Sequence, residues 1–185
     1  MKAEVKQPEA NADPDIVIRQ SEPGDAGYVA YMHGKYYHEH YGFGKMGEYY
    51  FIKYLADFVL DNSGGRLWIA ESGGGIIGSA AIVRVDSKTA QFRWFLVDES
   101  FQGKGIGSRL IGATLDFCSE SKFDTVFLWT FKGLDKARAI YDKAGFVLTE
   151  EKVNNEWRDV GIVEQKMELA LEECRKILWM NREYT

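Results

Sequence analysis

Cysteine, proline and long apolar runs are all scarce in this chain. Its 185 residues include two cysteines, Cys118 and Cys174, and three prolines. Two cysteines are too few for a disulfide framework, and no histidine lies near either in sequence to form a zinc site. No segment approaches the ~20 apolar residues of a membrane span, and residues 1–15 lack the apolar stretch of a signal peptide. We therefore expect a cytoplasmic protein without a membrane anchor.

Positive charge is also limited. The 23 lysines and arginines are outnumbered by 28 aspartates and glutamates, which gives a formal net charge of -5 at pH 7. Without a basic block, the chain lacks the electrostatic surface of a nucleic-acid binder. A hydrophobic fraction of 45% is typical of one compact domain.

The chain divides into an arm, a domain and a tail. Residues 1–15 are polar and show no periodicity, which predicts a mobile arm. Residues 16–169 alternate between strand-like and helical patterns and form the domain. Residues 170–185 are expected to form a closing helix with a short tail.

Within the domain, the spacing of apolar residues predicts both helices and strands. The expected helices cover residues 26–40, 47–60, 106–119 and 134–143. The expected strands cover residues 16–18, 66–71, 76–85, 90–97, 125–130, 146–153 and 162–168. The three strands between residues 66 and 97 should form an antiparallel meander. We predict a single α/β (α+β) domain with a mixed, largely antiparallel central sheet flanked by helices.

A glycine-rich turn after the third strand of this meander is the most informative segment. The turn consists of Gln102, Gly103, Lys104, Gly105, Ile106, Gly107 and Ser108. Glycine lets a backbone approach a ligand closely, and the free amides and dipole at a helix start attract anions. The turn therefore predicts a phosphate-bearing ligand.

The spacing of the glycines discriminates between the candidate phosphate-bearing ligands. A P-loop requires G-x-x-x-x-G-K-[ST], which the turn does not contain. The dinucleotide pattern G-x-G-x-x-G fits Gly103 and Gly105 but meets Ser108 at its third glycine, and the preceding strand is antiparallel. A nicotinamide or flavin cofactor is therefore the weaker alternative, and a helix start with no ligand stays open.

Two ordered motifs resemble a known family. The pattern Gln102-x-x-Gly105-x-Gly107 is similar to the [QR]-x-x-G-x-[GA] signature of the GNAT superfamily of N-acetyltransferases. The block from Ala137 through Tyr141 to Phe146 resembles that family's A-x-x-x-Y-x-x-x-G-F element. The resemblance extends over residues 16–169 and implies a GNAT-like fold.

The resemblance has one departure and one narrower form. Leu134 stands where many members carry asparagine, which puts one polar contact near the cofactor in doubt. Residues 93–98 and the run Tyr41-Gly42-Phe43 look like the acetyltransferase halves of certain bacterial fusions with MarR-type regulators. We find no DNA-binding half in this sequence and expect no regulatory role.

The resemblance implies acetyl-coenzyme A as donor and direct transfer of its acetyl group to an amine. In that family the strands here covering residues 92–97 and 125–130 splay apart, and the pantetheine arm lies between them. The turn from Gln102 to Ser108 would hold the pyrophosphate, with Lys104 or Arg109 adding positive charge. The backbone that would pair with the arm belongs to Phe95, Leu96 and Val97.

Direct transfer requires an acid and a base. An amine with a pKa near ~10.4 must lose a proton before attack, and the leaving thiolate, with a pKa near ~8.5, must gain one. Tyr141 is the candidate acid, because a phenol can donate to a thiolate. Glu39, near the end of the first helix, is the candidate base, and a water chain without a single base is the alternative. The other groups weighed for this role are His38, His40, Asp98 and Glu99.

Residues 28–54 hold all three histidines and eight of the ten tyrosines. No metal site is expected, because His33 and His40 can share a helix face but His38 points away. Single rings can simply pack the helices. For the segment as a whole, tyrosine walls suit an acceptor pocket.

The identity of the acceptor stays open. Small amines, amino acids, and a protein N-terminus or lysine all remain, and the net charge favours cationic acceptors. The alternatives to an enzyme of this kind are a catalytically inactive acyl-coenzyme A sensor and a nicotinamide-dependent oxidoreductase. The aromatic surplus and the last helix could serve a homodimer.

Overall fold

The computed structural model describes residues 16–157 and 160–171. These residues form one seven-stranded sheet in the order β1-β2-β3-β4-β5-β7-β6. The strands are β1 (Val17–Gln20), β2 (Arg66–Ser72), β3 (Gly75–Arg84), β4 (Thr89–Val97), β5 (Thr125–Phe131), β6 (Val147–Asn154) and β7 (Ile162–Ala170). The helices are α1 (Asp25–Tyr41), α2 (Lys45–Leu60), the short 3₁₀ turn η1 (Glu99–Phe101), α3 (Ile106–Glu120) and α4 (Asp135–Lys143).

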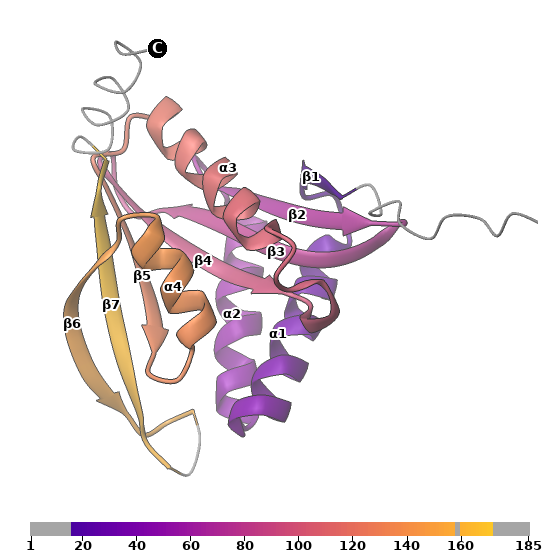
Figure 1. Cartoon of the computed structure of the whole chain (residues 1–185), viewed down its shortest axis with the longest axis vertical. Coiled ribbons are helices and arrows are strands. Elements are labelled where there is room, and N and C mark those ends of the chain that lie inside the picture. Colours follow the sequence, from indigo (N-terminus) through magenta and orange to yellow (C-terminus); the bar gives the residue numbers. More distant parts are fainter. Residues whose placement is uncertain (1–15, 158–159, 172–185) are drawn as a thin grey trace, which may run out of the picture.

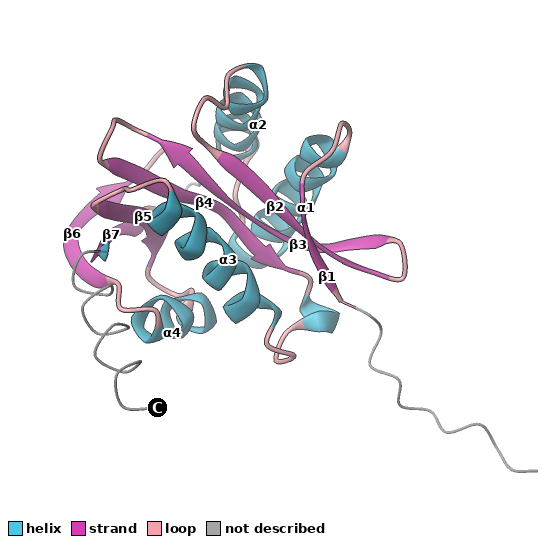
Figure 2. Cartoon of the chain, turned by 90° about the horizontal axis from the view of Figure 1, so that it is seen from above, coloured by secondary structure: helices cyan, strands magenta, loops and turns pink. Residues whose placement is uncertain are grey.

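Helices cover both faces of the sheet, with α1 and α2 on one face and α3 and α4 on the other (Figures 1 and 2). Because side chains alternate along a strand, β3 serves two cores at once. Ile82 packs into the core beneath α3, whereas Ala81 packs with Val29 and Leu55 beneath α1 and α2. The predicted mixed, largely antiparallel sheet flanked by helices is confirmed, since β4 and β5 are the only described strands that pair in parallel.

Helix α3 packs one face against the sheet. Its buried residues are Ile106, Gly107, Leu110, Ile111, Thr114 and Cys118. Phe117 is only partly buried and packs at the edge of this core. This spacing fixes which side of α3 faces the sheet and therefore where its N-terminus points.

The main core extends past residue 169, the predicted end of the domain. Strand β7 continues to Ala170, and Leu171 is buried in the main core. The first strand also differs, because β1 pairs over residues 17–20 rather than 16–18. The predicted arm, residues 1–15, and most of the predicted closing helix lie outside the described residues. None of the described helices is long and apolar enough to cross a bilayer.

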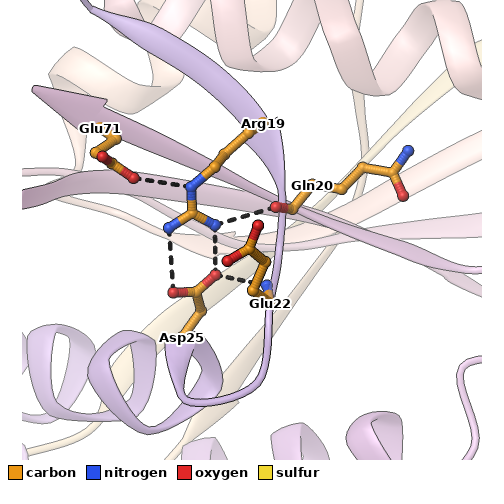
Figure 3. A network of polar contacts seen from close by, with 5 residues as sticks. All are labelled: Arg19, Gln20, Glu22, Asp25 and Glu71. Carbon is orange, nitrogen blue, oxygen red and sulfur yellow. Dashed lines mark hydrogen bonds and ion pairs between the residues drawn. The ribbon is translucent and has the colours of Figure 1, made fainter. Parts of the chain in front are cut away.

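A polar network ties the start of α1 to the sheet (Figure 3). The Arg19 guanidinium donates through Nε to Glu71 at 2.8 Å and through Nη1 to Asp25 at 2.6 Å. Asp25 also accepts the Glu22 amide at 2.7 Å, and its contact with Arg19 lowers the carboxyl pKa below its usual range. An acidic residue suits the first turn of a helix. The network fixes where α1 leaves β1, and so where the far half of α1 lies.

Candidate active site

The site lies where strands β4 and β5 separate, which we call the fork. Strands β4 and β5 pair only where residues 89–91 meet residues 125–127, and the last pair is Gln91 with Phe127. Beyond this point β4 stays bonded to β3, with Val97 opposite Gly78. The outer backbone edge of residues 92–97 therefore has no strand partner within the described chain. The predicted splay of these two strands is confirmed.

A β-bulge in β4 aims its side chains at the fork. Trp94 has a positive φ of 47°, which is unusual for any residue but glycine. The register between β3 and β4 shifts at this point, and the Ser79 hydroxyl donates to the Trp94 carbonyl at 2.7 Å. The extra residue breaks the alternation of the strand, so that Arg93 and Trp94 both line the fork.

The glycine-rich turn follows β4 and leads into α3. Gly103 and Gly105 have φ values of 80° and 79°, and a Cβ added at either would meet nothing within 4 Å. The first helical hydrogen bond runs from the Arg109 amide to the Gly105 carbonyl at 3.1 Å, and no side chain of the described residues caps the helix. The amides of the first turn are therefore available to an anion.

Gly107 has a different role from its neighbours. A Cβ at this position would come within 2.8 Å of the Ile140 side chain, so this glycine lets α4 pack against the start of α3. Gln102 fixes the turn from the other side, because its amide donates to the Val97 carbonyl at 3.1 Å and accepts from Lys136 at 3.0 Å. The turn is thus held by both β4 and α4.

One cavity of about 1070 Å³ joins these features and continues towards α1 and α2. Its lining includes nine of the ten residues predicted to contact the cofactor, which are Phe95, Leu96, Val97, Gln102, Gly103, Gly105, Ile106, Gly107 and Ser108. Lys104 is not part of the lining and lies 5.0 Å from the Phe101 ring centroid. Arg109 donates to the Ile16 carbonyl at 2.9 Å.

Tyr141 lines the same cavity from α4. It is 6% exposed and lies among aromatic rings, with the Phe95 centroid at 5.8 Å and the Phe146 centroid at 6.2 Å. Burial raises the pKa of the Tyr141 phenol above its usual range, because a low dielectric disfavours the tyrosinate. The phenol is therefore protonated at neutral pH and able to donate.

The end of the cavity away from the turn has aromatic walls. Tyr37 stacks on Phe51 and Phe43 with ring centroids 5.0 and 5.3 Å apart, and Phe131 and Trp157 extend the cluster. All five residues line the cavity. The aromatic-rich segment predicted to wall a pocket therefore supplies part of one.

The family follows from a direct comparison of sequences. The model of the acetyltransferase (GNAT) family matches residues 26–146. The chain belongs to this family. N-alpha-acetyltransferase RimI of Mycobacterium tuberculosis is 37% identical over 81 residues, which cover 42% of this chain and 49% of RimI. The chain spans about half the length of the curated relatives it matches.

Solved structures share the fold of this GNAT chain. The yncA protein of Salmonella typhimurium, solved with its cofactor acetyl-CoA, has a TM-score of 0.69 at 16% identity over 84% of this chain and 94% of yncA. Spermidine N-acetyltransferase of Vibrio cholerae, solved with CoA and spermine, has a TM-score of 0.65 at 18% identity over 84% of this chain and 95% of its own.

The structure places Glu39, the predicted base, away from the cavity. Glu39 is exposed on α1 and does not line the cavity. Its helix presents a different set of residues to the cavity, namely His33, Tyr36, Tyr37, His40 and Tyr41. These residues are spaced three or four apart and therefore share one face of α1. Residue 39 points more than a quarter of a circle away from the centre of that face.

Three carboxylates line the cavity in place of Glu39: Glu99, Asp135 and Glu164. Glu164 is 4% exposed and lies 3.3 Å from the Lys152 ammonium. The Glu99 carboxylate lies 3.4 Å from His40 Nε2, which brings η1 close to the end of α1. Sequence reasoning missed Glu164 because only the position of β7 beside β5 brings it to the fork.

The three histidines have separate surroundings. His33 is buried and its Nδ1 lies 2.8 Å from the Val29 carbonyl, whereas His38 Nδ1 lies 3.0 Å from the Phe43 carbonyl. Burial lowers the pKa of His33 to about 4. Among the described residues, no cluster of three histidine, cysteine or acidic side chains is arranged to hold a metal.

Proposed function

We propose that this GNAT acetyltransferase moves an acetyl group from acetyl-CoA directly to the nitrogen of an amine, with Tyr141 as general acid. The proposal rests on one observation: a single cavity joins the glycine-rich turn, the open edge of β4, Tyr141 and an aromatic end. The family match and the acetyl-CoA bound to yncA support the choice of donor.

The turn and the fork fit the parts of this donor. The uncapped amides at the start of α3 suit a pyrophosphate, because they point at the ligand and the helix dipole favours negative charge. The free edge of residues 95–97 suits an amide-bearing chain that adds to the sheet like a strand. When bound, acetyl-CoA supplies a thioester carbonyl and a thiolate leaving group.

The residues of the cavity then have to manage two protons. As the new C–N bond forms and the C–S bond breaks, Tyr141 donates its phenolic proton to the departing sulfur. The amine nitrogen loses one proton, which passes to water or to a cavity carboxylate such as Glu99 or Glu164 and finally restores the phenol. The net products are the acetylated amine and the CoA thiol.

Calorimetric titration of the purified protein with acetyl-CoA tests the donor, with NAD as control. We expect saturable binding of acetyl-CoA alone, followed by CoA release when an amine is added. Binding of NAD in its place would contradict the proposal and favour an oxidoreductase. Binding of acetyl-CoA without transfer to any amine would also contradict it, and would favour an inactive acyl-CoA sensor.

A further inference from the structure

Arg93 brings an unpaired positive charge into the cavity. The residue is partly buried on β4 and lines the cavity. Its guanidinium carbon lies 4.6 Å from the Tyr54 ring centroid and 4.9 Å from that of Trp94. Across residues 16–157 and 160–171, no carboxylate or other acceptor bonds to it. Its five N–H donors are therefore available to a ligand.

The absence of a carboxylate partner is costly for a residue in this position. Burial lowers the pKa of the Arg93 guanidinium, which means that the charge has lost hydration without gaining an ion pair. Arg19 shows the opposite arrangement, since it bonds to both Asp25 and Glu71. A bound anion would give Arg93 the partner that the protein gives Arg19.

Other unpartnered polar atoms surround the same cavity. The Trp94 indole nitrogen, the Thr130 hydroxyl and His33 Nε2 have no hydrogen-bond partner among the described residues, and these side chains are 6%, 7% and 1% exposed. All three residues line the cavity. Buried polar groups without partners are rare in native proteins, so three around one cavity indicate a polar ligand.

These polar groups differ in whether they require a hydrogen-bond acceptor or a donor as partner. The Trp94 indole N–H and the neighbouring Arg93 guanidinium can donate hydrogen bonds but cannot accept them. Both therefore suit an acceptor such as a carboxylate. His33 Nδ1 bonds to the Val29 carbonyl and must donate, so Nε2 carries a lone pair and can accept from an amine. Glu164 adds a buried negative charge for the same amine.

We propose that the acceptor is an amino acid whose carboxylate is bound by Arg93 and whose large apolar side chain packs among the aromatic walls. This inference rests on the proposed function and names its substrate class. An acceptor for this site needs a carboxylate close to a free amine. A free amino acid is the most compact molecule that carries both groups. A polyamine, as bound by the spermidine N-acetyltransferase of Vibrio cholerae, has no carboxylate for Arg93.

The test compares matched acceptors at saturating acetyl-CoA. The panel contains L-phenylalanine and other apolar amino acids, their carboxamides, a short peptide and spermidine. We expect kcat/KM for the amino acid to exceed that for its carboxamide by about tenfold or more, since a charge-assisted, bidentate contact is lost in the amide. The peptide distinguishes a free amino acid from a protein N-terminus as the source of the amine.

Arg93→Met should lower kcat/KM for the amino acid by about tenfold and leave that for the carboxamide within about twofold. Arg93→Lys, which keeps the charge but not the planar fork, should lie between the two. Arg66→Met is the matched control, because the Arg66 guanidinium carbon stacks 4.4 Å from the Phe117 ring centroid and Arg66 does not line the cavity. It should leave both acceptors unchanged.

The inference is overturned if the natural protein uses the amino acid and its carboxamide equally well, or prefers spermidine or the peptide. In that case the protein would still be an N-acetyltransferase. An equal loss for both acceptors in Arg93→Met and Arg93→Lys would also overturn it, because Arg93 would then act through the fold. If the folded protein binds acetyl-CoA and acetylates no amine at all, the proposed function itself is contradicted.

Discussion

At one end of the cavity the lining residues come mainly from one continuous segment between residues 95 and 108, whose backbone offers the free edge of β4 and the uncapped start of α3. At the other end they are side chains brought together from α1, α2, β4, β5 and β7. A backbone site depends on glycines and a helix start, so few substitutions preserve it. A side-chain site can change residue by residue within the same fold. We propose that the first end binds the donor and that the second sets the choice of acceptor.

Tyr141 lies between the two ends, and its removal should have the largest effect. In Tyr141→Phe we expect kcat to fall by about 100- to 1000-fold, as is usual for a general acid, while the acetyl-CoA affinity changes little. Steady-state kinetics and calorimetry measure the two quantities. Tyr28→Phe is the control, because Tyr28 is exposed and does not line the cavity.

Unchanged turnover in Tyr141→Phe would remove Tyr141 from the chemistry and leave it as a packing residue. The pH profile gives a second check. Because the pKa of Tyr141 is raised, its phenol keeps the proton at alkaline pH, and kcat should show no decline from tyrosine ionisation below about pH 10.

The backbone end is tested by Gly105→Glu. The new side chain would occupy a φ of 79° and place a carboxylate at the start of α3, where it competes with the phosphates for the helix amides. We expect acetyl-CoA affinity to fall by about 100-fold, equivalent to ~2.7 kcal/mol. Calorimetry measures the loss.

Gly112→Ala is the control for this substitution, since Gly112 lies in the same helix and an added Cβ there meets nothing within 4 Å. It should bind acetyl-CoA like the natural protein. If Gly105→Glu retains full affinity, the donor does not bind at this turn.

His33 tests the side-chain end through stability. Its pKa is about 4 in the folded protein and close to ~6.5 when unfolded, so the unfolded chain binds the proton more tightly between these values. The free energy of unfolding should therefore fall as the pH is lowered from about 6.5 to about 4, by on the order of 3 kcal/mol from this group.

Denaturant titrations at several pH values measure this effect. In His33→Phe, which places another ring beside Phe51, that part of the pH dependence should disappear. If the natural protein and the variant lose the same stability as the pH is lowered, then His33 protonates freely in the folded state, contrary to its burial.

The smallest effect is expected for Glu39→Gln. Glu39 is exposed on the face of α1 away from the cavity, so kcat/KM should change by less than about twofold, the range of a surface substitution. Initial rates with one fixed amine suffice to measure it. A tenfold loss would return the role of base to Glu39.

The sequence predicted which residues line the backbone end of the cavity because these residues are contiguous. The turn from Gln102 to Ser108 and the apolar face of α3 are local patterns, and Gly105 adopts the left-handed conformation that glycine readily takes. Nothing local identifies the bulge at Trp94, because a tryptophan with positive φ is imposed by the pairing of β4 with β3.

The side-chain end was less predictable because it depends on topology. Glu164 enters the cavity only because β7 lies between β5 and β6. The orientation of Glu39, by contrast, is a local feature, since His33, Tyr37 and Tyr41 share a helix face from which residue 39 is turned away. Helical spacing carried that information.

The most direct test of acetyl transfer is a stoichiometry. The purified protein is mixed with acetyl-CoA and the panel of amines, and mass spectrometry quantifies the acetylated products beside a thiol assay for CoA. The account predicts one CoA thiol released for each N-acetylated amine, with no release when the amine is omitted. Saturable binding of acetyl-CoA with no acetylated amine would contradict it.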